Sequence, residues 1–330
     1  MPDLNEAQIR SFQQGRGLNV TGVIDAVTAR ALEEAKWKLG DRSLSVQEYP
    51  LMRGDDVAAL QSRLTEMGFD CGRVDGIYGV RSAAAVKEFQ QSVGITVDGK
   101  CGPATIIALL RLTRIVSGGA PSLLRESATQ RNRGPALANK VIVLNPTGDD
   151  SLIYDVALRT EGRLLALGAS VFLTRGAANN PSESERIAFT NQSQADLMIS
   201  LDCDGYKNER AHGAATYFYG SDSHGIHSIV GERFASLVQR EICARTDLTN
   251  CRTHAMAWDL LRLTKAPAVQ IDVGYHSNSG DMERLSRADF RDVVAEALVI
   301  AIQRLYLAAE DDAKTGTLRI ADLRKAGLRR

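Results

Sequence analysis

The chain has 330 residues, of which 44% are hydrophobic and 24% charged, a composition typical of a globular protein with two or three folded cores. Forty basic residues balance forty acidic ones, so no net charge attracts the chain to nucleic acid, an anionic membrane or an acidic substrate. The N-terminus has no basic segment followed by an apolar one, and no apolar stretch is long enough to span a bilayer. We therefore expect a cytoplasmic protein that binds no nucleic acid and is not membrane-embedded, unless a leader has been removed.

The N-terminal part of the chain contains an internal repeat with an offset of 77 residues. The first copy is assigned to residues 1–44 and the second to residues 45–116. The matching positions are Ile9, Phe12, Gln13, Gln14, Gly17, Leu18, Val20, Gly22, Thr28 and Leu32 in copy one, and Val86, Phe89, Gln90, Gln91, Gly94, Ile95, Val97, Gly99, Thr105 and Leu109 in copy two.

Apolar spacing in copy two predicts three helices, one between Gly54 and Gly68, one over about 80–93, and one over about 103–114 that begins at Pro103. Copy one begins too late to hold the first of these helices. It is either a truncated unit or one that borrows a helix from its neighbour. Cys71 and Cys101 lie in copy two and could meet in space, although scattered cysteines without a Cys-x-x-Cys pair favour reduced thiols.

A linker over 117–139, rich in Gly, Pro and polar residues, separates the repeats from a segment with a different pattern. Over 140–307, apolar strands alternate with helical stretches. This predicts an α/β domain with a mostly parallel sheet and flanking helices. The strands are expected over 141–145, 170–174, 197–201, 214–219 and 267–273, and the helices over 151–167, 183–194, 224–245 and 289–307. The charged tail, 308–330, is expected to be mobile.

Copy two resembles the peptidoglycan-binding repeat that accompanies many wall hydrolases. The resemblance is carried by Val-Asp-Gly-Ile-Tyr-Gly at 74–79, by Phe89-Gln90, and by the Val-Asp-Gly segment at 97–105. It implies small three-helix units. Such units either bind glycan or serve as docking and spacer modules, and the sequence leaves both possibilities open.

The α/β domain resembles the N-acetylmuramoyl-L-alanine amidases of the zinc type, in the segments 141–150, 195–204 and 267–278. That family binds zinc through a His, a Glu and a second His, and uses another Glu as acid and base. In this chain the three ligand positions are Gly148, Asp149 and Asp202, and the catalytic position is Asp272.

These substitutions argue against zinc hydrolysis. Zinc needs about three protein ligands and one open position to acidify a bound water. Gly148 has no side chain to offer, and Asp149 and Asp272 are one methylene shorter than Glu. We therefore expect a non-enzyme with no metal cofactor.

Two alternatives stay open for the aspartates. Asp149, Asp202 and Asp272, with Asp150 or Asp204, could converge at the ends of strands, where they would hold a hard cation or raise one another's pKa. Otherwise they are a solvated remnant. None of the five histidines occupies a ligand position, and His224 and His227 are expected to share a helix face at the surface.

Almost the whole chain resembles a group of actinobacterial amidase homologues that act in the cytoplasm. The resemblance implies a regulator of peptidoglycan precursor synthesis that activates UDP-N-acetylglucosamine enolpyruvyl transferase once a serine/threonine kinase has phosphorylated the tail. A phosphothreonine-reading protein and a lipid flippase are further implied partners. The phosphorylated positions would be Thr315 and Thr317, whereas the third threonine of that pattern is Arg319 here.

Two other functions remain as alternatives. One is an active zinc-dependent N-acetylmuramoyl-L-alanine amidase in peptidoglycan turnover, exported by a leader that the chain lacks. The other is a wall-binding module without further activity.

Overall fold

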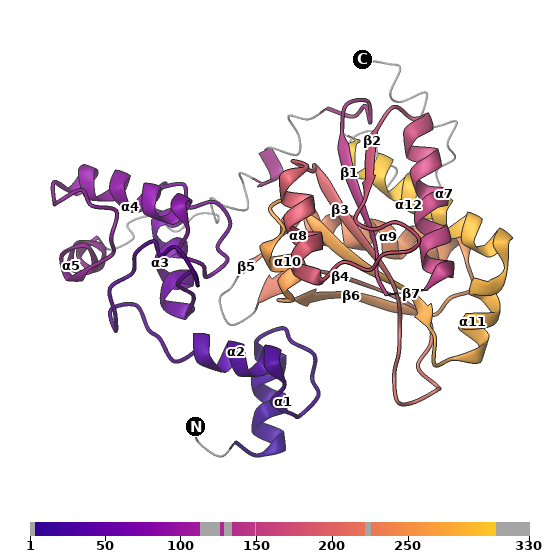
Figure 1. Ribbon diagram of the computed structural model, residues 1–330, viewed down its shortest axis with the longest axis horizontal. Coiled ribbons are helices and arrows are strands. Elements are labelled where there is room, and N and C mark those ends of the chain that lie inside the picture. The colour runs from indigo at the N-terminus through magenta and orange to yellow at the C-terminus, as the bar shows by residue number, and fades with distance from the viewer. Residues whose placement is uncertain (1–3, 113–125, 129–133, 149, 222–225, 308–330) are drawn as a thin grey trace. The chain divides into compact units, whose positions relative to one another are not determined.

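The computed structural model describes residues 4–112, 126–128, 134–148, 150–221 and 226–307. The chain divides into two compact units: one comprises residues 1–126 with 221–226, and the other comprises the remaining residues. The first is helical and the second is built on a β-sheet (Figure 1).

In the helical unit, α1 (Glu6–Gly15) and α2 (Ala26–Glu34) come from copy one, and α3 (Asp55–Glu66), α4 (Val80–Val93) and α5 (Pro103–Arg111) from copy two. The three helices that the sequence predicts for copy two are present, although α5 ends at Arg111 and not near residue 114. Their apolar faces meet in one core cluster that includes Leu60, Phe89 and Leu109. Cys71 and Cys101 are both buried in that cluster, and both are free thiols.

Buried glutamines on α1, α3 and α4 bind the loop that follows each of these three helices. Gln13, Gln61 and Gln90 are each at most 1% exposed. In each case the amide oxygen accepts the backbone N–H of a loop glycine, and the amide nitrogen donates to the hydroxyl of the next helix. The partners are Gly22 and Thr28 for Gln13, Gly76 and Ser82 for Gln61, and Gly99 and Thr105 for Gln90. The three glycines have φ between 71° and 78°, a conformation that other residues rarely adopt, so this turn needs glycine.

The second unit contains a seven-stranded sheet with the order β2-β1-β3-β7-β4-β5, in which β6 also pairs with β4. Four of the strand pairs are parallel, and β4 runs antiparallel to β7. The prediction of a mostly parallel sheet with flanking helices is therefore confirmed. The strands are β1 (Val141–Pro146), β2 (Ser170–Leu173), β3 (Leu197–Asp204), β4 (Ala214–Ser221), β5 (Ile226–His227), β6 (Asn250–Met256) and β7 (Ala268–Tyr275).

The longest helices pack together on the main hydrophobic core. The helices of this unit are α7 (Ser151–Ala166), α8 (Glu183–Gln192), α9 (Ile229–Arg245), α10 (Asp259–Leu263), α11 (Ser279–Ser286) and α12 (Ala288–Tyr306). Helix α12 packs against both α7 and α9, and α8 packs against α10 (Figure 1). The core cluster contains residues from α7, α9 and α12 together with inward-facing residues of β1, β3 and β7.

The sequence-based prediction of a helix over 224–245 is wrong at its start. The helix begins at Ile229, because Ser228 caps it by accepting the backbone N–H of Gly231. His227 lies in β5, with its Nε2 atom 3.4 Å from a carboxylate oxygen of Glu232. It therefore shares no helix face with His224, which lies outside the described residues. Strand β6 and helix α11 are not among the predicted elements, because they are short or have no clear periodicity.

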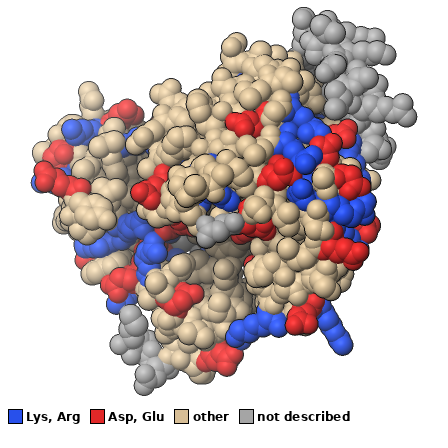
Figure 2. Space-filling model, turned by 45° about the vertical axis from the view of Figure 1, so that its right-hand side comes forward, with Lys and Arg blue, Asp and Glu red and all other residues tan. Residues whose placement is uncertain are grey.

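Opposite charges are interleaved on the surface formed by α7 and α12. Ion pairs join Asp155, Arg159, Arg163, Arg291 and Asp292 on these two helices. Figure 2 turns this side forward and shows blue and red atoms next to one another on it. Neither sign forms a continuous patch on this face, in keeping with the balanced composition. No described helix combines the length and the apolarity that crossing a bilayer would demand.

One ion pair inside the second unit is fully buried. Arg304 of α12 is 0% exposed and donates from Nη1 to Oε1 of Glu241 of α9 at 2.8 Å. Glu241, itself 1% exposed, also pairs with Arg245 one turn further along α9. The two helices are thus joined by a buried ion pair. A buried charge that loses its partner is strongly destabilising, because water no longer solvates it.

We predict that Glu241→Ala lowers the free energy of unfolding by about 3–5 kcal/mol, because it leaves the Arg304 guanidinium buried without this carboxylate. Denaturant unfolding followed by the fluorescence of Trp258, in a Trp37→Phe background, measures the change in this unit. Glu232→Ala on the same helix is the matched control, since its side chain is 51% exposed and its removal should change stability by about 0.5 kcal/mol or less. Equal effects of the two substitutions would contradict the assignment of Glu241 and Arg304 as a buried ion pair that stabilises this unit.

Candidate functional site

Two of the substituted positions lie side by side at the end of the central strands. In the parallel pair β3–β7, Asp202 is in register with Asp272. Residues in register on neighbouring strands have side chains on the same face of the sheet. The expected convergence of these two aspartates is therefore what the structure shows, at the carboxyl ends of parallel strands where α/β sheets bind ligands.

Asp272 is the more deeply buried of the two, with 2% of its surface exposed. Its Oδ1 accepts a hydrogen bond from Nε2 of Gln270 at 3.2 Å, and the hydroxyl of Tyr217 also bonds to the carboxyl. Burial, reinforced by the negative charges of Asp202 and Asp204, raises the pKa of Asp272 to about 7. Near neutral pH this group is therefore protonated in a large fraction of molecules.

Asp202 is held by its own strand end. Its Oδ1 accepts the backbone N–H of Cys203 at 2.9 Å. The hydroxyl of nearby Thr147 donates its proton to the backbone carbonyl of Leu201 at 3.0 Å. Burial raises the pKa of Asp202 above its ordinary value, while hydrogen bonding acts in the opposite direction.

The first ligand position carries no side chain. Gly148 has a φ of 59°, in the left-handed region that L-residues with a Cβ rarely adopt. Asp149, the second ligand position, lies outside the described residues. Asp150 turns toward the helix that follows, because its Oδ1 accepts the backbone N–H of Leu152 at 2.7 Å and caps α7.

The histidines in the described residues make other contacts. The ring of His276 covers Gly205 so closely that a Cβ built there would lie 2.1 Å from Cε1 of the ring. His212 and His254 each place a ring nitrogen 2.7 Å from a backbone carbonyl, of Arg210 and Cys251 respectively. None of these three rings occupies a ligand position of the resemblance.

The donors at this site do not fit a catalytic zinc ion. Glycine contributes no side-chain donor, one oxygen of Asp202 accepts the backbone N–H of Cys203, and Asp272 is protonated in a large fraction of molecules near neutral pH. Across the part of the chain that the structure describes, no group of three or more His, Cys, Asp and Glu side chains is arranged to hold a metal ion. The pair can hold and release a proton, and it can donate or accept hydrogen bonds.

Tyr217 and Gln270 belong to this site, and the sequence analysis missed both. Tyr217 is opposite Gln270 in the antiparallel pair β4–β7, and its ring packs against Trp258 at 4.7 Å between centroids. The alternation Gln270-Ile-Asp272 within a strand was a usable signal for Gln270, since residues two apart share a face. No local sequence pattern identifies Tyr217, because its position opposite Gln270 depends on the pairing of β4 with β7.

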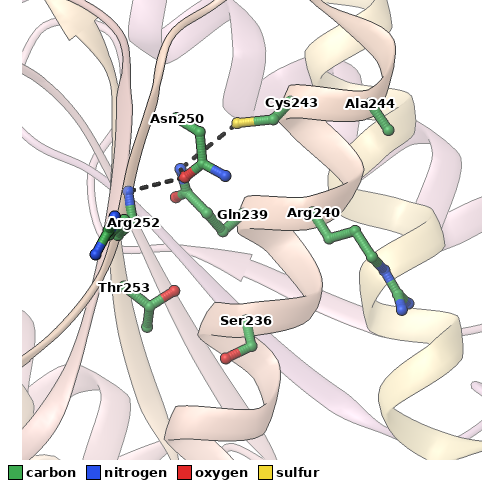
Figure 3. Close-up of a pocket in the computed structure, with 8 residues that line it drawn as sticks. All are labelled: Ser236, Gln239, Arg240, Cys243, Ala244, Asn250, Arg252 and Thr253. Carbon is green, nitrogen blue, oxygen red and sulfur yellow. Dashed lines mark hydrogen bonds between the residues drawn. The ribbon is translucent and has the colours of Figure 1, made fainter. Parts of the chain in front are cut away.

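The second unit also has a cavity of about 460 Å³ between α9 and β6. Gln239 stands in its wall, where Nε2 donates to Oδ1 of Asn250 at 2.9 Å and contacts the sulfur of Cys243 at 3.5 Å. Figure 3 shows that Arg240 extends away from the strand, so its charge is not directed at Asn250. None of the substituted ligand positions lines this cavity, and we do not assign it to the site.

We predict that Asp272→Asn stabilises the second unit by about 2–4 kcal/mol at pH 8. The folded pKa of about 7 lies above the ordinary value of 3.8, so the folded state keeps a proton that the unfolded chain loses between these values. Stability should therefore fall as pH rises from about 4 to about 7 and stay low above it, and the substitution should flatten this slope. Thermal unfolding at several pH values measures it. Asp247 is exposed, so Asp247→Asn is the control and should leave the pH dependence of stability unchanged. An unchanged pH dependence in Asp272→Asn would refute the pairing of Asp272 with Asp202.

Comparison with known proteins agrees with this architecture. A family model described as N-acetylmuramoyl-L-alanine amidase matches residues 139–304, and a model of a peptidoglycan binding domain matches residues 53–109. The N-acetylmuramoyl-L-alanine amidase CwlM of Mycobacterium tuberculosis is 41% identical to this chain, over 96% of the chain and 82% of the relative.

More distant relatives match the amidase-like unit alone or in part. The amidase LytC of Bacillus subtilis is 26% identical over 44% of this chain and 28% of its own length. The crystal structure of the amidase Ami1 from Mycobacterium smegmatis aligns with a TM-score of 0.46 at 18% identity, over 52% of this chain and 98% of that one. On the family model and the identity to CwlM, the chain belongs to the N-acetylmuramoyl-L-alanine amidase family, with a peptidoglycan-binding repeat before the amidase domain.

Proposed function

We propose that the protein is a catalytically inactive member of the amidase family that acts in the cytoplasm as a regulator of peptidoglycan precursor synthesis. Its target is UDP-N-acetylglucosamine enolpyruvyl transferase, which it activates after a serine/threonine kinase has phosphorylated the tail. A phosphothreonine-reading protein and a lipid flippase are further partners in this proposal.

The observation that carries the proposal is the state of the metal-binding positions. Gly148 offers no side-chain ligand. Asp202 accepts the backbone N–H of Cys203, and the pKa of Asp272 is about 7, so that this carboxyl is protonated in a large fraction of molecules near neutral pH. A family member that keeps its core while losing these groups retains a surface for other proteins but lacks the means to activate a water molecule.

The phosphorylated positions in this proposal are Thr315 and Thr317, which lie outside the described residues. A phosphate adds a charge of about −1.5 to −2 and strong hydrogen-bond acceptors, which suffices to create a binding site for an arginine cluster. The repeats serve as docking modules in the same proposal, with residues 1–44 and 45–116 as separate copies.

We predict that kinase-treated wild-type protein captures the enolpyruvyl transferase and raises its rate, whereas Thr315→Ala/Thr317→Ala does neither after the same treatment. Binding is measured by affinity capture with purified components, and activity by phosphate release. Thr96→Ala changes an exposed threonine of copy two and serves as the matched control, which should behave as wild type. Equal capture by wild type and the double variant would end the phosphorylation hypothesis.

The name of the relative that is 41% identical favours a second candidate, an active zinc-dependent amidase. We expect the purified protein to hold substoichiometric zinc and to release no stem peptide from isolated sacculi. Elemental analysis and chromatography of the digest measure these quantities, with a zinc amidase of the family as the positive control. One zinc ion per chain together with released peptide would establish the second candidate in place of the first.

A further inference from the structure

Two neighbouring aspartates at the start of α3 each bind an arginine from the part of the chain before them. Asp55 binds Arg16, the residue that follows α1, through hydrogen bonds from Nη1 to Oδ1 at 2.7 Å and from Nη2 to Oδ2 at 2.5 Å. Asp56 binds Arg42 through hydrogen bonds from Nε to Oδ2 at 2.7 Å and from Nη2 to Oδ1 at 3.2 Å. Negative side chains are favoured near a helix N-terminus and positive ones near a C-terminus, so Asp55 and Arg16 each stand at the helix end that suits their charge.

The two ion pairs differ in how far water reaches them. Asp56 is 1% exposed, and Arg42 also donates to the carbonyl of Arg53 and lies over the ring of Trp37 at 4.4 Å from its centroid. These contacts fix residues 37–42 to the start of α3. In the other pair the side chain of Asp55 is 29% exposed and that of Arg16 is 13% exposed. Dissolved ions therefore screen the pair of Arg16 and Asp55 more strongly than the buried pair.

Helices α1 and α2 keep their shape without the core of copy two. Among the described residues, no member of the core cluster of the helical unit comes from α1 or α2. Ile9 and Leu18 are buried but lie outside that cluster. Gln13 of α1 holds the following loop and α2 through its bonds to Gly22 and Thr28. Separation of Arg16 from Asp55 thus leaves the core cluster and the clamp of Gln13 intact.

The backbone just after α2 is weakly bonded. The N–H of Lys36 lies 3.3 Å from the carbonyl oxygen of Glu33, and the N–H of Trp37 lies 3.5 Å from that of Glu34. Both distances exceed the usual range of about 2.7–3.2 Å. A few residues at the end of an element suffice to absorb the dihedral change of a hinge. Since Trp37 is held by Arg42, the pivot falls at residues 35–36.

We propose that Arg16 and Asp55 form an ionic latch that sets the orientation of α1 and α2 on copy two. With the latch closed, the two helices move together with α3. With the latch open, they turn about residues 35–36 as one body, and high ionic strength favours this open state because it screens the pair. The latch is independent of the proposed regulatory role and of the phosphorylation of the tail.

The test is nitrogen-15 relaxation of the isotope-labelled full chain, which reports how fast each helix tumbles. In the wild type at low salt, amides of α1 and α2 should have the same ratio of transverse to longitudinal relaxation rates as amides of α3 and α4. Arg16→Asp should lower the ratio in α1 and α2 about twofold, because a tethered body tumbles faster. Sodium chloride at about 1 M, where the Debye length is about 3 Å, should lower it in the wild type as well.

The charge swap Arg16→Asp/Asp55→Arg should restore the wild-type ratio at low salt, because it re-forms the pair with reversed charges. Arg81→Asp is the matched control: it reverses one charge of the exposed pair that Arg81 forms with Asp70 inside copy two, and it should leave the ratio unchanged. The latch is refuted if Arg16→Asp leaves α1 and α2 tumbling with α3, if the swap restores nothing, or if Arg81→Asp has the same effect. Random-coil amide shifts over residues 5–34 in Arg16→Asp would also refute it, because the ion pair would then support folding and not orientation.

Discussion

The lateral pairing of β3 with β7 is the constraint on which the rest of the candidate site depends. The parallel register places Asp202 beside Asp272 near the ends of the central strands. The residues of these strands are buried in the main hydrophobic core. Two carboxyl groups in such a place cannot both ionise freely, so one keeps its proton to higher pH. The strand ends where this family binds its metal here present two neighbouring carboxyl groups, with Tyr217 and Gln270 beside Asp272.

The proposed loss of zinc chemistry rests on residue type at the substituted positions. Gly148 carries no side chain, and Asp150, two residues further, caps α7. A single histidine at position 148 would leave the other substituted positions unchanged. One substitution would therefore not restore the ligand set of the family.

The two units use polar groups in different ways to hold their shape. In the helical unit, three glutamines turn the loop after a helix into a fixed connection, because each satisfies backbone N–H groups that would otherwise be buried without a partner. In the other unit, Glu241 and Arg304 join two helices through a charge pair inside the core. Both devices favour rigid surfaces, and rigid surfaces suit a protein whose proposed role is to bind other proteins.

The sequence by itself determined the element types, the repeat and the identity of the substituted positions. Periodicity was sufficient to predict α4, which has the predicted bounds. It was also sufficient to predict where the main strands lie along the chain, because long amphipathic or apolar segments have few alternative structures. The Val-Asp-Gly motifs pointed to the loops that the glutamines hold.

Tertiary structure alone decided which side chains meet. The neighbours of Asp272 come from β3 and β4, and the pairing of these strands is a contact between distant residues that leaves no local pattern. The start of α9 was decided by the pairing of residues 226–227 in β5 and the cap at Ser228, which override an otherwise helical stretch. Burial is likewise a property of the packed whole that no residue carries alone.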